Sequence, residues 1–142
     1  MKINNQTIYR FLFSIVFLIF LSSCSQSPQE KLVGEWYGKD ETGKIASLVL
    51  GTDHSAKMIQ GNMVLDGSSI GGKVTWELDA KQNPMHLDLV MNLDSGETKR
   101  LLFIVRFVGK NKLQARIGKN HSERPVSFSE SNDVNQIILV KQ

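Results

Sequence analysis

Strict alternation of apolar and polar side chains is the sequence feature that most limits how this chain can fold. The clearest stretches are residues 73–79, 85–93 and 100–107, in which every second residue is apolar. Successive side chains of a strand point to opposite faces, so this period is typical of strands that bury one face. No stretch has the apolar pattern of an amphipathic helix of about ten or more residues. The sequence therefore predicts an all-β fold.

Short segments of turn-forming residues separate these stretches: GTDHS (51–55), DGSSIGG (66–72, a predicted hairpin loop), DSGE (94–97) and GKNK (109–112). Short turns favour antiparallel pairing of consecutive strands. An open sheet of this width would expose two long edges, and closure into a barrel removes them. We expect an up-and-down barrel of roughly eight to ten strands over residues 31–142. A two-sheet sandwich is the alternative, although its long crossing connections are scarce before Gly118.

The N-terminal tract has the order of charge, apolar core and small residues that is typical of a secretory signal. Lys2 and Arg10 precede an apolar run, Phe11–Leu21, which Ser14 alone interrupts. That run spans roughly 16 Å as a helix, against about 30 Å for the hydrocarbon core of a bilayer. We therefore predict a signal peptide over residues 1–23, with a permanent transmembrane helix as the weaker alternative.

The four residues Leu21-Ser22-Ser23-Cys24 resemble the lipobox of bacterial lipoproteins. The resemblance implies transfer of a diacylglyceryl group to Cys24 Sγ, cleavage before Cys24 and acylation of the new N-terminus. Two or more acyl chains anchor a protein stably to a membrane. Ser25, rather than Asp, implies the outer membrane more than the inner one in a host that has both. Residues 24–30 would then be the lipidated cysteine and a polar tether of at most about 20 Å.

The charge balance gives little support for a nucleic-acid partner. Lys2 and Arg10 are the charged residues of the predicted signal, so its removal reduces 17 Lys and Arg to 15, against 14 Asp and Glu. There is no basic cluster with interleaved aromatic residues, which nucleic-acid binding favours. Cys24 is the sole cysteine of the chain, so the domain has no disulfide to hold it together.

The segment GEWYG, preceded by Leu32, resembles the Gly-x-Trp motif that opens the first strand of lipocalins and other calycin-type barrels; Leu32, Gly34 and Trp36 match L-x-G-x-W. ERPVSF (123–128) also resembles a tract of some lipocalin-like bacterial families. The resemblance implies a lipocalin-like barrel whose tryptophan packs at the barrel floor beneath a basic residue. Arg124 is the candidate for that basic residue. The alternative is that Trp36 simply fills the core.

Several large apolar residues are predicted to face the barrel interior, and methionine is common among them. Methionine adapts to variable apolar ligands. An interior formed by about eight strands holds either side chains or one small ligand. We therefore expect either a filled core or a cavity for a small hydrophobic molecule. The candidate ligand-binding residues are Met58, Trp76, Met85, Met91, Phe103 and Phe107.

A second apolar set is predicted to point outward. Val90, Leu102 and Ile104 alternate out of phase with the interior set. They would form an exposed patch for a protein partner or a membrane. The alternative is that the looser segment, residues 118–133, folds back and covers them.

Catalytic and metal-binding motifs are lacking. The three histidines, His54, His86 and His121, lie in separate segments, and neither HExxH nor a G-x-S-x-G elbow occurs. We therefore expect no catalytic residues, no metal site and no cofactor. The sequence predicts a lipid-anchored envelope protein that binds a small apolar ligand; the alternative is an interaction or structural lipoprotein with a filled core.

Overall fold

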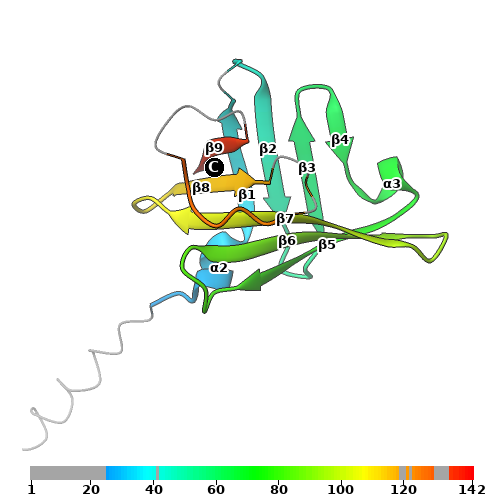
Figure 1. Ribbon diagram of the computed structural model, residues 1–142, viewed down its shortest axis with the longest axis horizontal. Helices are drawn as coiled ribbons and strands as arrows, with labels where there is room; N and C mark the ends of the chain where they lie inside the picture. The colour runs from blue at the N-terminus through cyan, green and yellow to red at the C-terminus, as the bar shows by residue number, and fades with distance from the viewer. Residues whose placement is uncertain (1–24, 41, 119–120, 122, 130–134) are drawn as a thin grey trace, which may run out of the picture.

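The computed structural model describes residues 25–40, 42–118, 121, 123–129 and 135–142 (Figure 1). Cys24 and the predicted signal peptide lie outside the described residues. The described part of the chain forms one nine-stranded sheet and two short helices. The helices are α2 (Pro28–Leu32) and α3 (Gly67–Ile70). The strands are β1 (Gly34–Lys39), β2 (Ile45–Leu50), β3 (Ala56–Gln60), β4 (Met63–Leu65), β5 (Gly72–Asp79), β6 (Met85–Leu93), β7 (Thr98–Phe107), β8 (Lys112–Ile117) and β9 (Gln136–Lys141).

The strands form an antiparallel up-and-down barrel that is nearly closed. The order in the sheet is β4-β3-β2-β1-β9-β8-β7-β6-β5, so every neighbour is sequential except the pair β9 and β1. That pair joins the last strand to the first through Tyr37 and Val140. An isolated bridge between Ser55, which precedes β3, and Thr75 of the edge strand β5 brings the two sides of the sheet together. This arrangement confirms the predicted all-β barrel.

The alternation of apolar and polar residues in the sequence matches the alternation of buried and exposed residues in the strands. In β5, Val74 and Trp76 are buried, whereas Lys73 and Glu77 are exposed. The inward-facing residues of all nine strands meet in one apolar core, which extends from Leu32 to Leu139. A chain that begins at Ser25 therefore keeps the whole of this core.

Helix α2 closes one end of the barrel. Ser27 and Glu30 form a capping box, in which each side chain accepts a hydrogen bond from the other residue's backbone N–H. Leu32, at the end of the helix, is fully buried, and its carbonyl accepts a 2.7 Å hydrogen bond from Trp36 Nε1. Residues 28–30, expected in the polar tether, thus belong to α2. The linker before the helix is only Ser25–Ser27.

Helix α3 occupies the segment that was expected to be a hairpin loop. Asp66 caps its N-terminus by accepting a hydrogen bond from Ser69 N, and Gly71 ends it with a φ of 61°. β4 and β5 lie at opposite edges of the sheet, so the segment carries the chain from one edge to the other. The hairpin prediction is wrong because the capping box makes a helical turn of DGSSI. Neither helix in the described part of the chain is long and apolar enough to cross a membrane.

Candidate functional site

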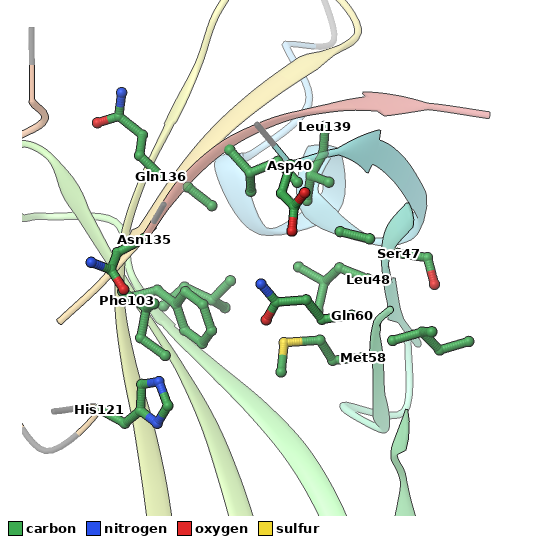
Figure 2. A pocket seen from close by; sticks show the side chains of 16 residues that line it. Asp40, Ser47, Leu48, Met58, Gln60, Phe103, His121, Asn135, Gln136 and Leu139 are labelled. Atoms are coloured by element: carbon green, nitrogen blue, oxygen red, sulfur yellow. The ribbon is translucent and has the colours of Figure 1, made fainter. Parts of the chain in front are cut away.

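A cavity of about 110 Å³ lies inside the barrel (Figure 2). It lies at the end opposite α2, as the course of β1 shows. β1 begins at Gly34, close to α2, and Asp40 at its far end lines the cavity. At about 3.3 Å per residue, Gly34 and Asp40 are roughly 20 Å apart. The deep wall is apolar and includes Leu48, Met58, Leu87, Phe103, Ile137 and Leu139. The rim is polar and includes Asp40, Gln60, His121, Asn135 and Gln136. An apolar wall with a few polar groups at its edge is the usual composition of a ligand site.

Small side chains at inward-facing positions leave this space open. Ala46 in β2 and Ala115 in β8 both line the cavity. Ala46 pairs with Gly38 and Gln60, and Ala115 pairs with Val105 and Ile137. Neither alanine reaches across the barrel as the tryptophans do at the other end. The strands pair regularly around both alanines, so the cavity results from these small side chains and not from a break in the sheet.

Asp40 is held in place by a tight turn at the rim. Its Oδ1 accepts hydrogen bonds from Thr42 N at 2.9 Å, Thr42 Oγ1 at 2.6 Å and Lys44 N at 2.9 Å. The Thr42 hydroxyl contributes most to lowering the pKa of the Asp40 carboxyl below its usual value. Asp40 is therefore ionised at neutral pH. Figure 2 shows its carboxylate and the Gln60 amide turned toward the same space.

Met58 and Phe103 are the two predicted ligand-binding residues that line the cavity. The other four lie away from it. Met85 and Met91 pack in the core, and Phe107 lies 6.3 Å from Trp36. Trp76 donates from Nε1 to Gly51 O at 2.9 Å and stacks on His54 with ring centroids 4.9 Å apart.

Asp40 and Gln60 line the cavity but are not among the ligand-binding residues predicted from the sequence. A signal for Gln60 was present, because it has the same parity in β3 as the inward-facing Ala56 and Met58. A polar side chain at an inward position indicates either a solvated barrel end or a binding group. Asp40 follows β1 with the same parity as the inward-facing Trp36, and its turn holds the carboxylate at the rim of the cavity.

Lys141, rather than Arg124, lies over the ring of Trp36. Lys141 Nζ is 5.2 Å from the indole centroid and donates a 2.7 Å hydrogen bond to Lys31 O. Arg124 instead donates to Asp88 Oδ1 at 2.6 Å and to Phe103 O at 2.7 Å. The prediction for Arg124 is wrong because its segment lies on the outer face of β6 and β7. The barrel wall separates that segment from Trp36.

The outward set does not form an exposed patch. Val90 and Ile104 are only 4% and 1% exposed, and Leu102 is half-buried. The segment from Glu123 to Ser129 folds back over this face, as the Arg124 contacts with Asp88 and Phe103 show. Arg116 Nη1 also donates to Ser127 O, and the Arg106 guanidinium lies 4.5 Å from the Phe128 ring centroid.

No group of three or more His, Cys, Asp or Glu side chains among the described residues could hold a metal ion. His54 instead takes part in closing the α2 end. Its Nδ1 lies 3.1 Å from Trp76 O, and its Nε2 lies 3.3 Å from Gln29 Nε2. In comparisons of the chain with family models, curated proteins and solved structures, nothing matches.

Proposed function

We propose that the chain is a lipid-anchored protein of the bacterial cell envelope whose barrel binds a small apolar group. The observation that carries the proposal is the apolar cavity with a polar rim at the end of the barrel opposite α2. The lipobox-like tract at Cys24 supports the anchor. The alternative, a protein-interaction role for Val90, Leu102 and Ile104, has no comparable support, because two of these residues are buried.

The short linker gives the anchor a structural consequence. Three residues, Ser25–Ser27, separate Cys24 from α2. Fully extended, they span at most about 10 Å. A lipid on Cys24 therefore holds the α2 end of the barrel close to the bilayer. The mouth of the cavity faces away from that membrane, toward solutes of the surrounding compartment.

The cavity volume limits the size of the ligand. At about 110 Å³ it is smaller than an apolar cavity of about 150 Å³ that accepts benzene. An alkyl group of about four carbons fits this space. Met58, with its flexible thioether chain, can adjust to somewhat larger groups. Burial of four methylene-sized groups provides about 3 kcal/mol, which corresponds to a dissociation constant of several millimolar.

The ligand test is an NMR titration of residues 25–142 with 1-butanol. We expect saturable shifts centred on Met58 and Phe103, with a dissociation constant in the millimolar range. The variant Ala115→Leu fills the cavity and should abolish the shifts while the barrel stays folded. Met85→Leu, at a core residue outside the cavity, is the matched control and should bind as the parent does. Uniform, non-saturable shifts in the parent would refute the binding function.

The anchor test uses the full chain in a bacterial host. Mass spectrometry of the N-terminal peptide should show a diacylglyceryl-modified Cys24 as the first residue. Cys24→Ser should move the protein from the membrane fraction to the soluble fraction with an unchanged melting temperature of the domain. An unmodified Cys24 in a membrane-bound protein would refute lipid anchoring and leave the cavity proposal standing.

A further inference from the structure

The rim of the cavity carries one fixed charge among the described residues that line it. Asp40 is that residue; His121 is the other titratable one, and no lysine or arginine lines the space. Lys44 lies four residues after Asp40; its backbone N–H donates to Asp40 Oδ1, and its side-chain charge contributes a smaller share to lowering the pKa of Asp40. Its side chain extends along Gly61, where a Cβ atom would lie 3.4 Å from Lys44 Cδ. The charge of the described residues that line the cavity is therefore negative, and the Lys44 ammonium group is not among them.

The two oxygens of Asp40 have different roles. Oδ1 accepts all three hydrogen bonds of the turn, from Thr42 and Lys44. Oδ2 accepts no hydrogen bond from the described residues, and Asp40 forms no ion pair with them. The turn thus fixes the carboxylate over the cavity and leaves one oxygen available to a ligand. An ionised acceptor of this kind binds a charged donor more strongly than a neutral one.

The amides of the rim do not discriminate by charge. Gln60 and Asn135 each carry a donor and an acceptor, so they suit anionic, neutral and cationic head groups alike. The Gln136 amide already forms two hydrogen bonds with the backbone of Ser129: its Nε2 donates to Ser129 O at 3.2 Å, and its Oε1 accepts from Ser129 N at 2.9 Å. Selection among head groups therefore depends on Asp40.

We propose that the cavity selects apolar ligands with a cationic head, an alkylammonium group, and rejects the corresponding carboxylates. The alkyl chain contacts Met58, Phe103 and Leu48, and the ammonium group donates to Asp40 Oδ2. A carboxylate in the same position meets the Asp40 charge with no basic side chain in the described lining to offset it. This inference rests on the proposed binding function, since it names the ligand class of the same cavity.

The test compares three ligands that share a butyl chain: butylammonium, 1-butanol and pentanoate. Each is titrated into residues 25–142 by NMR at the same pH and ionic strength. We expect butylammonium to bind about five- to twentyfold more tightly than pentanoate, with 1-butanol between them. Residues 25–142 carry a net charge of +1, from 15 basic and 14 acidic side chains, which would by itself favour pentanoate. A preference for butylammonium therefore reports the local field of Asp40.

Asp40→Asn is the variant that isolates the charge. Its Oδ1 still accepts the hydrogen bonds of the turn, so the fold should persist while the three ligands become equal within about twofold. Asp53→Asn is the matched control. Asp53 Oδ1 accepts from Ser55 N at 3.0 Å and Ser55 Oγ at 2.6 Å in the same kind of turn at the α2 end. This control should retain the parent's selectivity.

Salt provides a second measurement that needs no variant. At 1 M NaCl the Debye length falls to about 3 Å, and the preference should shrink toward that of Asp40→Asn. Binding of 1-butanol without any preference for butylammonium would overturn this inference and leave the binding function intact. Failure of all three ligands to bind would overturn both. Equal loss of selectivity in Asp53→Asn would also overturn it, because the effect would then come from overall charge.

Discussion

The two ends of the barrel are built from the same strands and differ in what fills them. At the α2 end, Leu32 and Trp36 are fully buried, and Lys141 lies over the indole. At the other end, Ala46 and Ala115 occupy inward positions and leave a cavity. The alternation of the strands continues unchanged through both ends. Side-chain volume at inward positions, rather than strand pattern, thus decides whether a section of this barrel is solid or hollow.

Trp36→Ala removes a large side chain from the filled α2 end of the barrel and should have the largest effect on stability. Trp36 is 1% exposed and its Nε1 donates to Leu32 O, so truncation creates a void and an unpaired carbonyl. We expect the free energy of unfolding to fall by about 3–5 kcal/mol. Urea denaturation measures it. Tyr37→Ala, at the next residue of β1, is the control: its side chain faces outward, is 37% exposed and should cost less than about 1 kcal/mol. Equal losses at the two positions would contradict the distinction between them.

A matched pair of alanine substitutions sharpens the comparison between the ends. Ala56 faces inward near α2 and pairs with Leu50, whereas Ala115 faces the cavity. Ala56→Leu overpacks a filled region and should cost about 1–3 kcal/mol. Ala115→Leu enters existing space and should change stability by less than about 0.5 kcal/mol. Thermal melting of both variants tests this, and a greater loss for Ala115→Leu would mean that the cavity end is not hollow.

Lys141→Met tests the cation over Trp36 and should have a smaller effect. The methionine keeps an apolar stem but removes the ammonium group 5.2 Å from the indole centroid and its hydrogen bond to Lys31 O. We expect a loss of about 1 kcal/mol in urea denaturation. Lys112→Met is the control, because Lys112 is an exposed residue of the neighbouring strand β8 and should change stability by under about 0.5 kcal/mol. No difference between the two variants would exclude a stabilising cation at Trp36.

The sequence predicted the barrel well because alternation is a local property of each strand. It placed Met91 and Phe103 alike on the inward face, yet only Phe103 lines the cavity. Parity fixes the face of a residue, whereas its height along the barrel axis depends on register with strands distant in sequence. The assignment of Arg124 to Trp36 came instead from the resemblance to lipocalins, which names a basic residue for the barrel floor but does not locate it in this chain. The partner of Trp36 is Lys141, which the pairing of β9 with β1 brings opposite it.

Substitution of the turn aspartates, Asp40 at one end and Asp53 at the other, should have the smallest effect on stability, and the effect should be equal at the two ends. The pKa of Asp40 is lowered mainly by the Thr42 hydroxyl, and that of Asp53 mainly by the Ser55 hydroxyl. A carboxyl with a lowered pKa in the folded state stabilises the fold above the unfolded value of about 3.9, and this contribution is lost as the pH falls below it.

Asp40→Asn and Asp53→Asn should each therefore reduce the drop in melting temperature between pH 7 and pH 3. Melting curves of the parent and both variants over this range measure the change. Parallel pH profiles in all three proteins would show that these turns do not contribute to acid sensitivity. Similar reductions in the two variants would show that the ends share their turn chemistry. Any difference in ligand selectivity between the variants then comes from the cavity that lies beneath Asp40 and not beneath Asp53.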